Sequence, residues 1–503
     1  MLSPKQLHGY QKKATLHQLY HDNSMLWLGC GLGKTPVTLT TIEHRIRAGQ
    51  VKKVLVFGPV RVIHAVWERE ARKWEHTKHL TFSIVGWPNE KKRKQGLAND
   101  ADIYLCNYEN MNWLATYLQH YYIDQGKPLP FDMVVYDEIT RVKNSTSLRV
   151  AGGRKEKVKN RGKTNEVRTP YRVTGWRAML PHIKYSTGLT GTPAANGYTD
   201  LHGQYLMIDG GQRLGEYITH YKEAYFTTGY DGWTQEVTEI GKQWIEHKIA
   251  DITVKMDAED YLELPDLIEN DIVVDLSEKQ MEKYREIEQD MYTQLDNGTE
   301  IEVFNRASVS NKCLQYSNGS VYTDPGNPTS PWEDIHDEKL QALDSIIEEA
   351  QGKTVLVGYT FRFDADRIMR RYKNLNPVNL TSVKPEDLTK VLADGNAGRI
   401  KLMIGHPKSL GHGVDGLNEF CKIIVWYGLP WSLEEYTQLI GRIAAGQRFT
   451  VPVTMHRILS RSTLDVAVLD ALRRKEGDQN GLKNAIQRYR DGMTPLDGTE
   501  GFI

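Results

Sequence analysis

The chain has 503 residues, of which 40% are hydrophobic and 25% are charged, and its formal net charge at pH 7 is zero. This length and apolar content are sufficient for two or more domains, each with a core of its own. The balanced charge excludes a protein that binds nucleic acid through a large overall positive charge, although it leaves room for a local basic groove.

The spacing of the cysteines and the absence of long apolar runs indicate in which compartment the protein acts. The cysteines lie far apart without a CxxC pair, so they indicate neither a zinc site nor a disulfide framework: Cys30, Cys106, Cys313 and Cys421. Scattered reduced thiols are typical of cytosolic proteins. No apolar run approaches the roughly 20 residues that cross a bilayer, and Ser3 to His8 are too polar for a signal-peptide core. We expect a cytoplasmic protein that does not associate with membranes.

Short apolar runs alternate with helical stretches such as Val62–Trp74 along the first half of the chain. Three runs are bounded by Gly, Pro or Asp, as expected for buried parallel strands: Val54–Phe57, Ile103–Cys106 and Met133–Tyr136. A second series follows later: Thr354–Val357, Ile400–Ile404 and Ile423–Trp426. This alternation predicts an α/β fold with two lobes, each a parallel sheet flanked by helices.

The segments outside the two series have other patterns. Glu278–Asn297 and Asp337–Gln351 carry apolar residues at helical spacing, which predicts a helical insertion at the second lobe. Ser317–Trp332 is rich in Gly, Pro, Asn and Ser and predicts a loop. Arg141–Arg177 is basic and poor in apolar residues, which predicts a surface insertion in the first lobe.

These patterns give a division of the chain. We expect a first lobe over 1–265 with its basic insertion near 141–177, a helical linker over 266–345, and a second lobe over 346–475. A charged C-terminal tail over 476–503 would pack on the second lobe or bind a protein partner, which the sequence does not identify.

A phosphate-binding loop is the strongest single signal. The stretch Met25-Leu-Trp-Leu-Gly-Cys-Gly-Leu-Gly-Lys-Thr35 runs from a short strand into glycines and then into a helix. Glycines at Gly29, Gly31 and Gly33 would turn backbone N–H groups toward phosphate oxygens. Lys34 would then reach the β- and γ-phosphates, and the Thr35 hydroxyl would bind Mg²⁺. Leu28 replaces the usual first glycine of this pattern.

Paired carboxylates follow the third apolar run, in Asp132-Met-Val-Val-Tyr-Asp-Glu138. Hydrolysis of a nucleotide needs one carboxylate for the Mg²⁺ shell and another that orients or deprotonates water. Asp137 is suited to the first role and Glu138 to the second. Such a pair at a strand end is usually a solvated turn, but its position about a hundred residues after a phosphate loop favours the catalytic interpretation.

The motifs, taken in order, resemble those of superfamily-two helicases, and Leu189-Thr-Gly-Thr-Pro-Ala-Ala-Asn196 is very close to the motif of the Swi/Snf-like branch. The resemblance extends over residues 7 to 450. The other segments that carry it are Leu7–Gln11, Pro59–Glu70 with Trp67, Asp137–Asn144, His406–Leu417, Trp426–Trp431 and Tyr436–Arg442. The compact length is similar to that of short phage and bacterial members, so the compartment would be that of a bacterium or a phage-infected cell.

The resemblance implies two RecA-like lobes that bind ATP and Mg²⁺ between them and track along nucleic acid. It implies that Gln11 reads adenine, that Thr190 and Thr192 couple the sites, and that Gln438 and Arg442 reach the γ-phosphate. Gly413 and Asp415 belong to a motif of the second lobe that we assign to nucleotide binding. Asn144 and Lys408 stand where the family contacts nucleic acid, and double-stranded DNA is the expected partner.

One motif departs from the family pattern. The segment Gln438-Leu-Ile-Gly-Arg-Ile-Ala-Ala-Gly-Gln-Arg448 has Ala445 where the branch has a second arginine, and it is one residue short. An arginine at the γ-phosphate can contribute roughly 10³–10⁵ in rate. Either Arg442 suffices, or Arg448 substitutes from a shifted loop, or hydrolysis is weak.

The sequence therefore supports two functional hypotheses. The first is an ATP-dependent DNA translocase or helicase, either moving on duplex DNA, separating strands, or acting with partner subunits. The second is an ATP-gated clamp that binds DNA but hydrolyses ATP poorly. A metabolic P-loop kinase would leave the Leu189–Asn196 motif and the second lobe unexplained.

Some basic and aromatic residues also have two interpretations. Arg141–Arg177 is either a nucleic-acid contact or a solvated loop, and Lys91–Lys94 is better explained as a solvated helix face. Trp426, Tyr427 and Trp431 could stack on bases, but beside Pro430 at a strand end they are better explained as packing. The helical spacing of Trp67 and Trp74 predicts core positions, and His412 is treated as polar surface.

Overall fold

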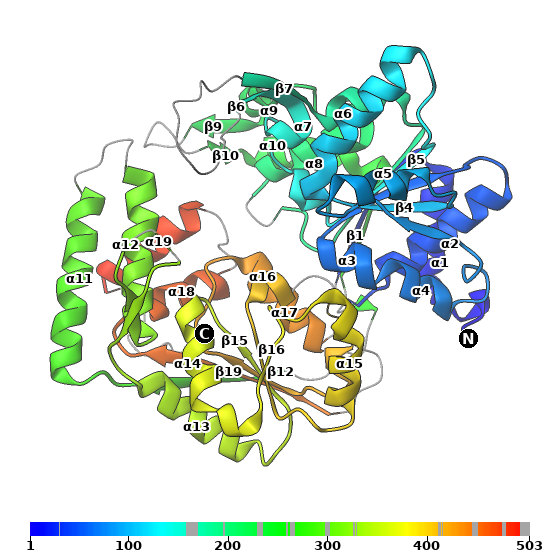
Figure 1. Ribbon diagram of the computed structural model, residues 1–503. Coiled ribbons are helices and arrows are strands. Elements are labelled where there is room, and N and C mark those ends of the chain that lie inside the picture. Colours follow the sequence, from blue (N-terminus) through cyan, green and yellow to red (C-terminus); the bar gives the residue numbers. More distant parts are fainter. Residues whose placement is uncertain are drawn as a thin grey trace, which may run out of the picture. The chain divides into compact units, whose positions relative to one another are not determined.

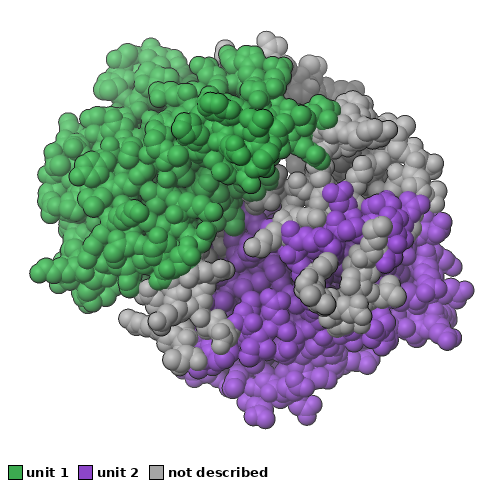
Figure 2. All heavy atoms as spheres, turned by 180° about the vertical axis from the view of Figure 1, so that it is seen from behind, with its two compact units in different colours: residues 1–261 green, residues 262–503 purple. Residues whose placement is uncertain are grey.

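The computed structural model divides into two compact units, residues 1–261 and 262–503, which are coloured separately in Figure 2. The described residues are 1–29, 31–156, 170–194, 197–228, 235–257, 260–261, 267–296, 302–324, 327, 329–410, 414, 416–444, 451–474 and 479–492. Each unit is an α/β lobe built on one parallel sheet flanked by helices (Figure 1). The predicted fold class is confirmed.

The first unit is built on a seven-stranded sheet in the order β11-β1-β8-β5-β2-β4-β3, and all of its pairings are parallel. The strands are β1 (Asn23–Leu28), β2 (Val54–Gly58), β3 (Phe82–Ile84), β4 (Ile103–Asn107), β5 (Met133–Asp137), β8 (Tyr185–Thr190) and β11 (Thr253–Met256). The central strands β2, β4, β5 and β8 are buried throughout, because helices cover both faces of a parallel sheet.

Helices connect these strands: α1 (Gly9–Tyr20), α2 (Lys34–Arg47), α3 (Val60–Ala65), α4 (Trp67–Lys73), α5 (Glu90–Ala98), α6 (Met111–Tyr121), α7 (Leu148–Ala151), α8 (Thr199–Asp209), α9 (Ile218–Tyr225) and α10 (Glu239–Ile249). The three strands predicted here are all present. The helical stretch predicted over Val62–Trp74 is present as two helices, α3 and α4, which are separated by a break at Val66 that was not predicted.

The basic segment Arg141–Arg177 is only partly described. It contains α7 and an antiparallel pair of strands, β6 (Gly152–Glu156) and β7 (Pro170–Thr174). Residues 157–169, which hold much of its charge, lie outside the described part of the chain. A second small antiparallel pair joins β9 (Phe226–Thr228) to β10 (Gln235–Val237).

The second unit is built on a six-stranded parallel sheet in the order β12-β19-β18-β15-β17-β16. The strands are β12 (Leu267–Val274), β15 (Val355–Gly358), β16 (Val378–Asn379), β17 (Leu402–Gly405), β18 (Ile423–Trp426) and β19 (Val453–Ser460). The helices are α11 (Glu278–Asp296), α12 (Glu302–Ser317), α13 (Glu338–Glu349), α14 (Arg362–Arg371), α15 (Pro385–Asn396), α16 (Pro407–Leu410), α17 (Leu433–Ala444), α18 (Leu464–Arg473) and α19 (Gln479–Arg490).

The segment before the second series contains more than the predicted helices. α11, α12 and α13 lie there, but β12 precedes them as an edge strand of the sheet and was not predicted. Its alternation is weak, since an edge strand exposes several of its side chains. Within the expected loop Ser317–Trp332, β13 (Ser320–Tyr322) pairs with β14 (Trp332–Asp334).

The C-terminal segment contains a helix that packs on the second unit. Ala485 and Ile486 of α19 are buried, and Arg488 pairs with Asp470 of α18 at 2.6 Å. Packing on the second lobe was one of the two alternatives left open by the sequence.

No helix among the described residues is both long and apolar enough to cross a membrane.

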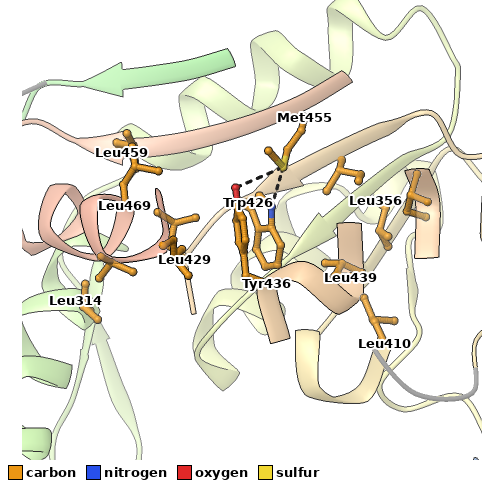
Figure 3. Close-up of a cluster of buried hydrophobic side chains, with 14 of the residues drawn as sticks. Leu314, Leu356, Leu410, Trp426, Leu429, Tyr436, Leu439, Met455, Leu459 and Leu469 are labelled. Carbon is orange, nitrogen blue, oxygen red and sulfur yellow. Dashed lines mark hydrogen bonds between the residues drawn. The ribbon is translucent and has the colours of Figure 1, made fainter. Parts of the chain in front are cut away.

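A hydrophobic cluster fixes α17 on the second sheet (Figure 3). The Tyr436 ring stacks on Trp426 with 5.0 Å between centroids and 25° between planes. The Trp426 indole donates to Met455 Sδ at 3.3 Å, and Tyr436 Oη contacts the same sulfur at 3.7 Å. Leu439 is also fully buried. Aromatic pairs in such geometry contribute about 0.5–1.5 kcal/mol beyond their buried area.

A buried ion pair ties helices of the second unit to its sheet. Lys339 Nζ lies 2.6 Å from Asp465 Oδ2, and the two side chains are 1% and 2% exposed. The same ammonium donates to Asn318 Oδ1 at 2.8 Å and to the carbonyl of Tyr427 at 3.3 Å. All three of its N–H donors are therefore used, which is the condition under which a buried lysine is tolerated.

Removing this lysine should destabilise the second unit. Lys339→Met leaves the Asp465 carboxylate buried without its counter-charge, and the loss should be about 3–5 kcal/mol. Lys283→Met is the control, because the Lys283–Glu286 pair is 63% and 62% exposed, and solvent screening should leave the free energy of unfolding nearly unchanged when it is removed. Urea denaturation followed by circular dichroism measures both, and equal losses would contradict the role of the buried pair.

Candidate nucleotide site

Three motifs lie at the carboxyl edge of the first sheet because their strands are neighbours. β8 is hydrogen-bonded to β1 on one side and to β5 on the other, with Trp27 opposite Thr190 and Asp137 opposite Leu189. The phosphate loop leaves β1, the Leu189–Asn196 motif leaves β8, and Glu138 follows β5. Parallel strands of an open α/β sheet place such ends at one edge, where ligands bind in this class of fold.

The phosphate loop has the backbone conformation that its glycines allow. Gly31 and Gly33 have φ of 84° and 81°, and Gly33 is the N-cap of α2. Lys34 and Thr35 occupy the first turn, so the positive end of the helix dipole and its N–H groups face the loop. Pro36 lies in the same turn. Its missing N–H costs no helical hydrogen bond, because the N–H groups of the first turn have no partner within the helix. Cys30 lies outside the described residues.

Gln11 packs directly on this loop. Its side chain is 6% exposed, accepts from the backbone N–H of His8 at 2.9 Å and donates to the carbonyl of Leu32 at 3.2 Å. A Cβ at Gly33 would lie 2.4 Å from Gln11 Nε2. The glutamine predicted to read adenine therefore lies beside the loop predicted to hold the phosphates, although the structure does not test the reading of the base.

The two carboxylates at the end of β5 are buried. Asp137 is 6% exposed and Glu138 is 8% exposed. Asp137 Oδ2 accepts from the Trp67 indole at 2.9 Å, and the backbone carbonyl of Asp137 accepts from Tyr108 Oη at 3.0 Å. Burial raises the pKa of Tyr108, so this hydroxyl stays a donor over the physiological range.

Glu138 has an unusual backbone conformation. Its φ of 57° and ψ of 60° place a non-glycine residue in the left-handed region. This conformation costs about 1–2 kcal/mol for a residue with a Cβ. Strain of this kind persists only where the surroundings impose it and is concentrated at functional sites. The feature supports Glu138 as a functional residue.

The Leu189–Asn196 turn lies between the other two motifs. Thr190 is fully buried, and its hydroxyl accepts from the backbone N–H of Thr192 at 3.1 Å. The Thr192 hydroxyl is buried and has no hydrogen-bond partner among the described residues. Gln204 of α8 donates to the carbonyl of Pro193 at 2.6 Å. Asn196 lies outside the described residues.

These residues suit a magnesium nucleotide. No group of three or more His, Cys, Asp or Glu side chains that could hold a metal occurs among the described residues. Mg²⁺ at phosphate sites needs no such group, because it keeps several waters and takes one or two carboxylates together with the phosphates. Asp137, at the end of β5, and Thr35, in the first turn of the helix after β1, provide one carboxylate and one hydroxyl at the same edge of the sheet, as this mode of binding requires.

The second-lobe residues Gln438 and Arg442 share one face of α17, because they are four positions apart. Gln438 Nε2 donates to Glu434 Oε1 at 3.0 Å, and both Gln438 and Arg442 are half-buried. Tyr436 and Leu439 of the same helix are buried in the core (Figure 3). Gly413, Asp415, and the departing residues from Ala445 to Arg448 lie outside the described part of the chain.

Asn144 and Lys408 are exposed, as a phosphate contact requires. Asn144 Oδ1 accepts from the backbone N–H and the hydroxyl of Thr146 at 3.0 and 2.8 Å, so it also shapes its own turn. The backbone N–H of Lys408 donates to His406 Nδ1 at 3.2 Å. Nothing in the structure tests a nucleic-acid contact by either residue. His412 lies outside the described residues.

The aromatic residues at the end of β18 are packing residues. Trp426 and Tyr427 are fully buried, and Trp431 is half-buried against the same core cluster. The interpretation of Trp67 and Trp74 as core residues is also confirmed, with 0% and 6% exposure. On α5, Lys94 pairs with Glu90 at 3.0 Å with both side chains at least half exposed, as expected for a solvated face.

Sequence reasoning missed the groups that hold the carboxylates. Trp67 was assigned to the core without a polar partner, and Tyr108 was not singled out. A buried indole N–H or phenol requires an acceptor, which is a usable signal. The sequence does not say which acceptor, because Trp67 and Asp137 are 70 positions apart.

Comparisons with known proteins agree with this arrangement. The model of the SNF2-related domain matches residues 6–161, and that of the helicase conserved C-terminal domain matches residues 338–446. Putative protein p41 of Acyrthosiphon pisum secondary endosymbiont phage 1 is 32% identical, covering 95% of this chain and 98% of that protein. The chain belongs to the Swi/Snf-like branch of superfamily-two helicases.

Two solved structures are also similar to this Swi/Snf-like chain. The Sulfolobus solfataricus SWI2/SNF2 ATPase core in complex with dsDNA shares 18% identity at a TM-score of 0.41, over 96% of this chain and 94% of that one. The Sulfolobus solfataricus SWI2/SNF2 ATPase core domain shares 20% identity at 0.39, over 93% and 88%. Family membership gives the chain a helicase-like ATPase core with two RecA-like lobes, and ATP is the nucleotide of this family.

The phosphate loop can be tested at Gly33. Gly33→Ala places a Cβ at a φ of 81° and 2.4 Å from Gln11 Nε2, so the loop must shift. We expect at least a tenfold loss of affinity for a fluorescent adenine nucleotide, measured by equilibrium titration. Gly9→Ala is the control, because a Cβ there meets nothing within 4 Å. Unchanged affinity in Gly33→Ala would argue against a nucleotide in this loop.

Proposed function

We propose that this Swi/Snf-like chain is a nucleic-acid-stimulated ATPase that moves along double-stranded DNA. The observation that carries the proposal is the convergence of the phosphate loop, the Leu189–Asn196 turn and the Asp137–Glu138 carboxylates on the neighbouring strands β1, β8 and β5. A nucleotide bound at this edge would meet phosphate-binding, coupling and hydrolytic groups together.

The first-lobe residues have distinct roles in the proposal. Backbone N–H groups of Gly31 and Gly33 and of the first turn of α2 bind the phosphates, with Lys34 as the charged donor. The N–H of Gly29, which the sequence also assigned to the phosphates, instead donates to the carbonyl of Met256 at 3.0 Å. Magnesium, held by Thr35 and Asp137, would neutralise phosphate charge. Glu138 orients the attacking water and accepts its proton, a role that suits a carboxylate buried beside the metal-binding residue.

The second lobe completes the site in this proposal. Gln438 and Arg442 act on the same nucleotide, and the arginine stabilises charge that develops on the γ-phosphate. Both lie on a helix whose orientation is fixed by the Tyr436 stack, which suits a group that must be placed accurately. Gly413 and Asp415 are proposed nucleotide contacts on family position alone.

Nucleic acid is the proposed track. Asn144 and Lys408 would contact the sugar–phosphate backbone, which gives affinity without sequence preference. Thr190 and Thr192 lie between the phosphate loop and β5, so a change at the phosphates reaches them first. Duplex DNA is preferred over single strands because of the family to which the chain belongs.

The activity is tested by ATP turnover with duplex, single-stranded and forked DNA and with RNA. We expect duplex DNA to give the largest stimulation, in a manner that weakens with salt. If none of these polymers changes the turnover rate, the proposed track is wrong. A strand-displacement assay on the fork separates unwinding from translocation without unwinding.

Glu138 should be needed for hydrolysis more than for binding. Glu138→Gln removes the base and keeps the size of the side chain, so turnover should fall by about 10²–10⁴. The affinity for a fluorescent nucleotide should change by less than about threefold, since the phosphate loop is intact. Loss of binding equal to the loss of turnover would instead assign Glu138 to the architecture of the site.

Arg442 should be the γ-phosphate arginine despite the altered motif. Arg442→Ala should lower DNA-stimulated turnover by about 10³-fold or more. Arg362→Ala is the control, because Arg362 is a 61% exposed side chain of the same lobe that pairs only loosely with Asp366, at 3.8 Å. Equal turnover in Arg442→Ala and the parent would remove this assignment. ATP-dependent DNA binding without repeated turnover in the parent would favour the clamp.

A further inference from the structure

A buried hydrogen bond joins the start of α4 to the strand-end carboxylate. Trp67 Nε1 donates to Asp137 Oδ2 at 2.9 Å. The Trp67 side chain is fully buried, and Asp137 is 6% exposed. The site assignments above give Trp67 no role other than packing, yet its polar atom contacts the side chain proposed to bind magnesium.

A break between α3 and α4 directly precedes Trp67. α3 ends at Ala65, Val66 has φ of −104° and ψ of −56°, and α4 begins at Trp67. Beyond the packing of the ring, the position provides the acceptor that a buried indole N–H requires.

An indole is suited to orienting a metal-binding carboxylate. It has one donor, no acceptor and no charge, so it fixes a carboxylate oxygen without neutralising it. A lysine or arginine in the same place would form an ion pair and compete with a cation for the carboxylate. Tyr108 holds the backbone carbonyl of the same residue, so both the main chain and the side chain of Asp137 are fixed.

We propose that Trp67 is a positioning residue that aligns the Asp137 carboxylate for Mg²⁺ bound with a nucleotide. The inference rests on the proposed nucleotide site. It adds Trp67 as a residue that determines how strongly nucleotide binding at that site requires Mg²⁺. Partners that orient metal-binding side chains typically contribute 10–100-fold to metal affinity or activity. The effect should therefore appear in the concentration of Mg²⁺ that nucleotide binding requires.

Trp74, at the opposite end of α4, provides a matched control. Its side chain is also buried, and its indole also donates to a carboxylate, Glu70 Oε1, at 3.2 Å. Trp67→Phe and Trp74→Phe thus remove the same atoms and the same kind of hydrogen bond. Only the first of these bonds involves Asp137.

The test is equilibrium binding of a fluorescent, non-hydrolysable ATP analogue to the full chain over a series of Mg²⁺ concentrations and in EDTA. For Trp67→Phe we expect the half-saturating Mg²⁺ concentration to rise about tenfold or more, with little change in the affinity in EDTA. For Trp74→Phe we expect less than a twofold change in both. If Trp67→Phe folds poorly, benzothienylalanine at position 67, which keeps both rings and lacks the N–H, replaces it.

The outcomes separate this inference from the proposed function. If the parent chain binds the analogue without any dependence on Mg²⁺, or does not bind it, the proposed nucleotide site itself is wrong. If the parent shows the dependence but the two phenylalanine variants shift it equally, or neither does, the positioning role of Trp67 is wrong. A loss in EDTA as large as the loss in Mg²⁺ would likewise overturn it.

Discussion

The double pairing of β8 is the interaction on which the candidate site depends. Its backbone is hydrogen-bonded to β1 on one side and to β5 on the other, over five register positions each. The phosphate loop follows β1 and the two carboxylates lie at the end of β5, about a hundred residues later in the sequence. β1 and β5 are not paired with each other. β8 sets the distance between them and places the Thr190–Thr192 turn in the space between. One short turn therefore lies between the phosphate loop and the two carboxylates.

Polar groups at this edge are held by the protein itself. Lys34 Nζ donates to the carbonyl of Leu28 at 3.0 Å, and Gln11 Nε2 donates to the carbonyl of Leu32. The Trp67 and Tyr108 donors do the same for Asp137. A loop whose groups already occupy defined positions loses less conformational entropy when a ligand binds. Of these donors to the loop, Gln11 lies outside it, so part of the order of the loop does not depend on its own residues.

The sequence predicted the repeated units of the fold better than its irregular parts. All six strands proposed from apolar runs exist, because strands buried on both faces are typically continuous apolar runs. β8 did not show this signal, since it is buried throughout but contains Ser186, Thr187 and Thr190. β12 escaped prediction, since an edge strand of the second sheet tolerates Glu269, Asn270 and Asp271 in succession. The break at Val66 also escaped, because apolar spacing continues through it.

The candidate site was predictable to the extent that chemistry dictates residue types. Phosphate binding needs glycines, a lysine and a hydroxyl, and hydrolysis needs carboxylates, so Lys34, Asp137 and Glu138 could be found by type and spacing. The groups that orient them could not, because a tryptophan or tyrosine that donates one hydrogen bond has the same pattern as one that only packs. The left-handed backbone conformation of Glu138 is likewise a consequence of the tertiary fold. The sequence could not predict it, because the position is not a glycine.

The two lobes solve the problem of accurate placement in different ways. In the first lobe, neutral donors fix Asp137 directly, because Trp67 bonds its carboxylate and Tyr108 bonds its backbone carbonyl. In the second lobe, Gln438 and Arg442 are placed by the helix that carries them, and the Tyr436 stack together with Leu439 fixes that helix on the sheet. Arg457 reinforces this from β19 by donating to Tyr436 Oη at 3.1 Å while it pairs with Asp271 of β12 at 2.5 Å. The placement of Arg442 therefore depends on the packing of α17, whereas the Asp137 side chain is held by a hydrogen bond of its own.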